Sequence, residues 1–156
     1  MTHHEKSQDL AEILKGKRFV MYTTVADGGA LVSRPMTIQE VEGDTVRFIA
    51  QDDNAVTKQS EGKQLNLAIM DGSTYVSLTG SGGVERDLQK KKELWDRLTE
   101  AYAGEPEDPN NIILEVTVTG GEYWEGGNPV VQLLGLAKAA VTGTRPDSGE
   151  HGTVEA

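Results

Sequence analysis

Short turns containing glycine separate consecutive β-strand patterns along this chain of 156 residues. The turn DGG lies at 27–29, EGD at 42–44 and DGS at 71–73. Turns of this length and composition join antiparallel strands, whereas parallel strands need a long crossover connection. The turns therefore favour a mainly β, antiparallel fold with flanking helices over a doubly wound sheet.

Six segments have strand patterns, rich in β-branched and aromatic residues. They occupy residues 17–26, 30–41, 45–51 and 112–127, with two more inside 64–87 on either side of the DGS turn. Gly80, Gly82 and Gly83 predict a bulge or bend in the fifth strand, which lets a sheet curl towards closure. We therefore expect a small, closed or nearly closed barrel of six antiparallel strands.

Helical patterns flank these strands. They lie at 5–16, with Leu10, Ile13 and Leu14 on one face, at 52–63, at 87–102 and at 128–143. The last segment is almost wholly apolar, with Lys138 as its single charge, so we expect a buried helix that packs in a subunit interface. From Thr144 onwards the composition is that of a disordered tail, which leaves residues 1–143 as a single domain.

The composition excludes several classes of function. A formal net charge of -10 argues against nucleic-acid or anionic-membrane binding, because phosphate groups require a basic surface. The absence of cysteine excludes thiolate chemistry and fits a reducing cytoplasm, where we expect the protein. His3, His4 and His151 lie in polar terminal segments, so we expect neither a histidine general base nor a metal site. No apolar run is long enough to span a bilayer, and residues 1–10 lack the features of a signal peptide.

The segment LVSRPMTIQEV at 31–41 interrupts a strand pattern with a cation and a proline. The period of two places Arg34 on the same face as the apolar Val32 and Met36. Pro35 cannot donate a ladder hydrogen bond, so it indicates an edge strand or a local gap that a ligand can approach. The alternative is structural: Arg34 pairs with one of the 25 acidic residues, and Pro35 protects an edge from aggregation.

Two further residues have both a binding and a structural interpretation. Lys58 comes after the third strand, at the start of the predicted short helix, where a cation beside helix N–H groups suits a phosphate. The alternative for Lys58 is a solvated surface lysine. Trp124 lies between two glycine pairs, where it could stack on a planar ligand or pack on the core.

Several segments in order resemble a known family. They are MYTTVADGGALVSRPMTIQEVEGDTVRFIAQ (21–51), LNLAIMDGSTYVSLTGSGGVERD (65–87), ELWDRL (93–98), EVTVTGGEYWEGG (115–127) and VVQLLGLAKAAVTG (130–143). Together they resemble the general stress proteins of the pyridoxamine 5′-phosphate oxidase-like superfamily, which are FMN-binding split β-barrels. The likeness extends over nearly the whole of residues 1–143.

This resemblance implies a homodimer with two FMN sites at the interface. The strand containing Ser33, Arg34, Pro35 and Met36 would lie along the flavin ring. The end of the third strand, at Ala50 and Gln51, and the next turn would hold the phosphate. Trp124 would be a contact from the partner subunit. The implied function is flavin binding, with a low-specificity, FMN-dependent reductase activity as one form of it.

The chain departs from the family pattern at the phosphate end. Family members commonly have a threonine at the end of the third strand and Ser-x-Lys shortly after it, whereas this chain has Ala50, Gln51 and DDNAVTK. The phosphate hydroxyl would then be displaced to Thr57, with Lys58 in place of the usual lysine. The arginines of true pyridoxamine 5′-phosphate oxidases are absent, so that activity is not expected. A deazaflavin-dependent reductase and a non-catalytic dimer that has lost flavin remain as alternatives.

Overall fold

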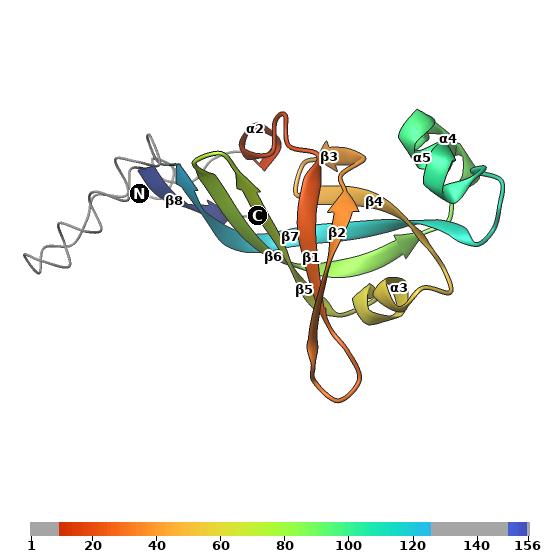
Figure 1. Ribbon diagram of the computed structural model, residues 1–156, viewed down its shortest axis with the longest axis horizontal. Coiled ribbons are helices and arrows are strands. Elements are labelled where there is room, and N and C mark those ends of the chain that lie inside the picture. The colour runs from red at the N-terminus through yellow and green to blue at the C-terminus, as the bar shows by residue number, and fades with distance from the viewer. Residues whose placement is uncertain (1–9, 126–149, 156) are drawn as a thin grey trace, which may run out of the picture.

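A computed structural model describes residues 10–125 and 150–155 of the chain (Figure 1). The strands are β1 (Phe19–Val25), β2 (Leu31–Thr37), β3 (Glu40–Glu42), β4 (Thr45–Gln51), β5 (Gln64–Asp71), β6 (Thr74–Glu85), β7 (Asn111–Glu125) and β8 (Glu150–Glu155). The helices are α2 (Leu10–Ile13), α3 (Ala55–Ser60), α4 (Leu88–Leu94) and α5 (Arg97–Ala103). The described chain is therefore mainly β, as the turns predict.

The strands form one antiparallel sheet in the order β2-β1-β5-β6-β7-β4-β3, with β8 added beside β7. β2 and β3 lie at opposite ends of this order, although only residues 38 and 39 separate them in the sequence. The sheet must therefore curl until its two ends come close together, and it is not closed. This arrangement confirms a split β-barrel with flanking helices, although the described chain has eight strands where six were expected.

The inside of the barrel is apolar and follows the alternation of the strands. On β7, the alternate residues from Ile112 to Val118 are at most 1% exposed. The predicted face of the first helix, with Leu10, Ile13 and Leu14, is buried in the same core. A register shift between residues 79 and 80 confirms the bulge predicted in the fifth strand.

The expected strand at 30–41 is two strands with different partners. Ile38 still bonds to the β1 side, where its N–H donates to the carbonyl of Arg18 at 2.6 Å. Gln39 already bonds to the β4 side, where its N–H donates to the carbonyl of Arg47 at 2.8 Å. The chain therefore leaves one end of the sheet and joins the other between these two residues, without a turn.

The expected helix at 87–102 is also divided, into α4 and α5. Asp96 ends the first helical run because its carboxylate accepts a hydrogen bond from the N–H of Thr99 at 2.8 Å and so caps a second helix. Both helices lie beside the β4 end of the barrel (Figure 1). They rest on a small cluster in which Leu94 packs with Ile49 and Ile113.

The end of the chain differs from the sequence-based prediction in part. Residues 150–155 were expected in a disordered tail, but they form β8, which pairs with β7 from Gly120 to Glu125. A long paired strand supplies backbone hydrogen bonds that a polar composition does not reveal. The apolar helix expected at 128–143, with Lys138, lies outside the described residues.

Candidate functional site

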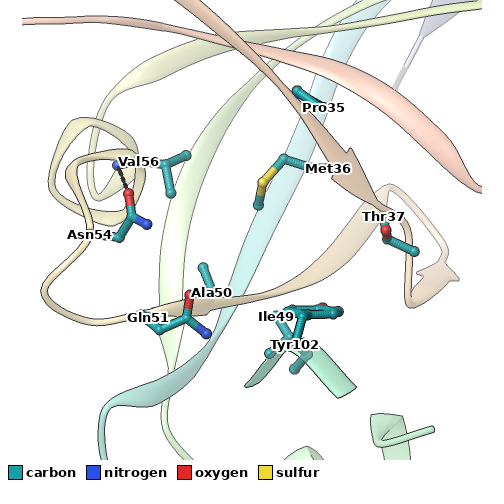
Figure 2. A pocket seen from close by; sticks show the side chains of 9 residues that line it. All are labelled: Pro35, Met36, Thr37, Ile49, Ala50, Gln51, Asn54, Val56 and Tyr102. Atoms are coloured by element: carbon teal, nitrogen blue, oxygen red, sulfur yellow. Dashed lines mark hydrogen bonds between the residues drawn. The ribbon is translucent and has the colours of Figure 1, made fainter. Parts of the chain in front are cut away.

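A pocket of about 290 Å³ lies where the barrel is split, between β2 and β4 (Figure 2). Its lining residues are Pro35, Met36, Thr37, Ile49, Ala50, Gln51, Asn54, Val56 and Tyr102. They come from two strand ends, from the turn before α3, from α3 itself and from α5. The split therefore brings two strands, a turn and two helices around one hollow.

The deep part of the pocket is apolar. The side chains of Met36, Ala50 and Val56 point into it (Figure 2). Met36 also packs against the barrel core, while Ala50 and Val56 are each 4% exposed. The pocket thus offers a flat apolar ligand a floor that is continuous with the hydrophobic core.

The ends of the pocket are polar. Asn54 and Gln51 lie on the side of α3, whereas Tyr102 and Thr37 lie on the opposite side (Figure 2). Burial raises the pKa of Tyr102, and the neighbouring side chains of Thr99 and Gln39 oppose this rise only in part, so the phenol keeps its proton at neutral pH. It can therefore donate a hydrogen bond to a ligand.

Arg34 lies beside this pocket and bonds to neutral groups. Its Nη1 donates to Thr24 Oγ1 at 2.6 Å and to the carbonyl of Tyr22 at 3.3 Å, and its Nη2 donates to Gln59 Oε1 at 3.2 Å. Burial lowers the pKa of Arg34. Among the described residues it has no acidic partner at ion-pair distance. This differs from the structural interpretation, in which Arg34 pairs with an acidic residue. It instead fastens β2 to β1 and to α3.

Pro35 lies in a strand at the end of the sheet, which confirms the edge position predicted for it. Ser33, two residues earlier, is exposed and shares a 2.6 Å hydrogen bond with the hydroxyl of Thr23. Of the four residues predicted to follow the ring, Pro35 and Met36 line the pocket, whereas Ser33 and Arg34 do not.

The turn after β4 is held mainly by its own hydrogen bonds. The hydroxyl of Thr57 is buried and donates its proton to the carbonyl of Gln51 at 2.7 Å. Lys58 is exposed and lies in the second half of α3, not at its start. Asp52 pairs with Arg86 at 2.9 Å, which lowers the pKa of the carboxyl group. The charge of this aspartate is thus offset by a cation that sequence reasoning missed.

Trp124 lies far from the pocket of its own chain. It pairs with Tyr75 near the end of β7, whereas the pocket residues of β4 pair with the start of β7 at 111–113. Eleven residues of strand at roughly 3.3 Å each separate the two places by about 36 Å of strand length. Trp124 is accordingly not among the residues that line the pocket of its own chain.

Five lining residues were not predicted as site residues. They are Thr37, Ile49, Asn54, Val56 and Tyr102. Asn54 carried a usable signal, because it caps α3 by accepting from the N–H of Val56 at 3.2 Å. Tyr102 carried none, since its position depends on the division between α4 and α5.

The described residues include no group of three or more His, Cys, Asp or Glu side chains placed to hold a metal ion. Nor do they include a helix that is both long and apolar enough to cross a membrane. The chemistry that this part of the chain offers is an apolar slot with hydrogen-bonding ends, which suits a planar organic ligand.

Known structures share this fold. A protein of Jannaschia sp. CCS1 assigned as general stress protein 26 is 24% identical with a TM-score of 0.68, and the match covers 93% of this chain and 94% of that one. General stress protein 26 of Bacillus anthracis str. Sterne is 19% identical with a TM-score of 0.66, over 79% and 94% of the two chains. The general stress FMN/FAD binding protein of Xanthomonas citri is 29% identical with a TM-score of 0.60, over 72% and 83%.

Sequence comparison gives the family directly. No curated protein is similar enough to this chain to count as a match. The sequence profile of the family described as Pyridoxamine 5'-phosphate oxidase like matches residues 5–147, which is most of the chain and includes every pocket-lining residue. The chain therefore belongs to the pyridoxamine 5′-phosphate oxidase-like family.

Proposed function

We propose that the protein binds a flavin, FMN, with the ring in the pocket between β2 and β4. The observation that carries the proposal is the position of the pocket at the split of the barrel, with an apolar floor and polar ends. Support also comes from the relative in Xanthomonas citri, which is a general stress FMN/FAD binding protein. When bound, the flavin would supply redox chemistry, and the chain would hold and orient it.

The pocket fits a flat ring better than a whole nucleotide. Its volume of about 290 Å³ is near the lower limit of small-molecule sites, roughly 300 Å³. The ring would rest on Met36, Ala50 and Val56, and the ribityl phosphate would extend past Asn54 towards the turn after β4. The same residues would accept a deazaflavin ring, which has nearly the same shape.

The phosphate end would rely on Lys58 and Arg86, because the Thr57 hydroxyl is already committed to Gln51. Both cations act on the carboxyl group of Asp52 and lower its pKa. A phosphate would have to compete with that carboxylate for them. We therefore expect FMN to bind more tightly than riboflavin. The difference in affinity should be smaller than it would be if Lys58 and Arg86 had no carboxylate beside them.

We also propose that the protein is a homodimer through the outer face of β1, β2 and β5. Exposed apolar side chains gather on this face: Phe19, Met21, Val25, Leu31 and Met70. Pro35 and Thr37, at the rim of the pocket, belong to the same face of β2. A second copy on this face would bury the apolar patch and come close to the pocket mouth.

Titration of FMN fluorescence tests the flavin proposal. Wild-type protein should quench the fluorescence saturably. Ala50→Leu adds a branched side chain to the pocket floor and should abolish the quenching, whereas Ala30→Leu, in an exposed turn, should leave it unchanged. Thermal unfolding of each variant shows that it is folded.

Three results would change the conclusion. Absence of quenching by the wild type would favour the non-catalytic alternative, and equal quenching by Ala50→Leu would place the flavin elsewhere. Displacement of FMN by a deazaflavin at lower concentration would favour the deazaflavin-dependent reductase.

Light scattering tests the dimer: Met21→Glu should give monomers, while Leu98→Glu, at a side chain equally exposed at 44%, should not.

A further inference from the structure

β2 directs alternate backbone groups to an edge that no described strand covers. At both ends of its ladder with β1 the bonded residues are even-numbered: Ile38 N–H donates to Arg18 at 2.6 Å, and the carbonyl of Ala30 accepts at 2.7 Å. Because bonded and non-bonded residues alternate in an antiparallel ladder, the odd-numbered residues of β2 face away from β1. The strand order gives that second edge no strand partner within the described chain.

β4 has the same alternation. Its ladder with β7 begins and ends at even-numbered residues, since the carbonyl of Asp44 accepts from Val118 at 2.8 Å and the N–H of Asp52 donates to Asn110 at 2.7 Å. The odd-numbered residues of β4 therefore face the other edge. β3 pairs with that edge only along residues 45–47. Beyond it, the backbone of residues 49 and 51 faces the split.

The two uncovered edges face each other across the pocket. The bond from Gln39 N–H to the carbonyl of Arg47, at 2.8 Å, closes one end of the split. From there the strands diverge around the pocket, which residues 35–37 line on one side and residues 49–51 on the other. The pocket is thus a wedge between two unpaired strand edges, with an apolar floor.

The backbone groups on these edges form a defined set of donors and acceptors. Thr37 and Ile49 each direct an N–H and a carbonyl to the split, and Gln51 directs an N–H. The Gln51 carbonyl is already occupied, because it accepts from the Thr57 hydroxyl at 2.7 Å and from the Asn54 N–H at 3.1 Å. Pro35 contributes only a carbonyl.

We propose that these backbone groups recognise the hydrogen-bonding edge of the ligand, so that the edge of a planar heterocycle pairs with strand backbone inside the split. The matching chemistry is a ring edge on which an N–H lies between two carbonyls, such as the pyrimidinedione part of a flavin. A peptide strand fits less well, since Pro35 interrupts the row of donors on β2. The inference rests on the proposed flavin binding and names its recognition mode.

Amide hydrogen exchange measured by NMR, with and without saturating FMN, tests this inference. The amide hydrogens of Thr37, Ile49 and Gln51 should exchange at least roughly tenfold more slowly in the complex than in the free protein. A hydrogen bond to the ligand must open before such an amide can exchange. The amides of Leu31 and Ser33 are the matched control, since they lie on the same edge of β2 but outside the pocket lining. Their exchange should not change.

A second measurement uses the ligand. Lumiflavin should bind at least roughly tenfold more tightly than 3-methyllumiflavin, in which a methyl group replaces the ring N–H hydrogen. Suppose that the protein quenches FMN fluorescence but amide exchange at Thr37, Ile49 and Gln51 is unchanged, or that both lumiflavins bind equally. Recognition by the strand backbone is then refuted, while flavin binding stands. If the protein does not quench FMN fluorescence at all, both flavin binding and backbone recognition are refuted. Protection caused by a strand-forming peptide in place of flavin would also overturn the inference.

Discussion

Replacing Arg34 with methionine should destabilise the fold much more than the loss of a surface cation does. Methionine keeps an unbranched stem of similar length but removes the guanidinium group. That group donates to Thr24 at 2.6 Å, to Gln59 at 3.2 Å and to the carbonyl of Tyr22 at 3.3 Å. These partners lie on β1 and α3, so the substitution loosens three elements at once.

The magnitude follows from the two shorter bonds. A hydrogen bond from a charged donor contributes about 1.5 kcal/mol or more, so losing those to Thr24 and Gln59 costs about 3 kcal/mol. With a urea m-value of about 2 kcal/mol/M, the unfolding midpoint should fall by about 1.5 M. Binding of FMN should weaken as well, because α3 carries Val56 into the pocket.

Urea unfolding followed by circular dichroism measures this effect. Arg86→Met is the matched control, because Arg86 is an exposed cation that pairs only with Asp52 among its described carboxylate neighbours. Its midpoint should stay within experimental error of the wild type. A fall for Arg34→Met no larger than that for Arg86→Met would refute the role of Arg34 as a fastening between β2 and α3.

Three further predictions concern the barrel and its helices. Burial raises the pKa of Tyr22 to about 12, so the protonated phenol contributes fully to the free energy of unfolding below about pH 10, and this contribution is lost as the pH rises to 12. Tyr22→Phe removes the titrating group, so its urea unfolding midpoint should fall less over this pH range than that of the wild type. Gly82→Ala would place a Cβ 2.3 Å from the carbonyl of Ser60 and should lower the melting temperature sharply, whereas Gly83→Ala, with its nearest atom at 3.9 Å, should not. The hydrogen bond from the backbone N–H of Thr99 lowers the pKa of Asp96, so Asp96→Ala should cost about 1 kcal/mol at pH 7 in urea unfolding, a difference that narrows as acid protonates the carboxyl below about pH 4.

The hairpins were predictable because the chain encodes them locally. The turns at 27–29, 42–44 and 71–73 lie between strands that the structure also pairs or joins, and the alternation from Ile112 to Val118 matches the buried face of β7. The bulge near Gly80 was predictable for a similar reason: a Cβ there would lie 2.5 Å from the carbonyl of Thr117. The spacing of turns and glycines in the sequence was sufficient to predict these features, although the atom that excludes a Cβ at Gly80 lies on another strand.

The pocket was predictable only in part, because it depends on contacts between distant segments. No glycine or turn marks the change of partner between Ile38 and Gln39, where a continuous strand pattern moves from one end of the sheet to the other. Tyr102 reaches the pocket from α5, a second helix whose start is capped by Asp96. The change of strand partner and the position of Tyr102 both depend on the tertiary structure, so local sequence patterns do not predict them.

Arg34 shows the same limit at a single residue. The sequence contains 25 acidic residues, so an acidic partner was a reasonable expectation. The structure instead gives it the hydroxyl of Thr24 and the amide of Gln59, neither of which charge patterning could select. β8 is comparable, because its pairing with β7 is made through backbone groups that any polar sequence possesses.

The crystal structure of the protein with FMN tests the central claim most directly. The account predicts electron density for the flavin ring in the split between residues 35–37 of β2 and 49–51 of β4, above Met36 and Ala50. Density for the ring at another place on the protein, or an empty split in crystals that have been saturated with FMN, would contradict it.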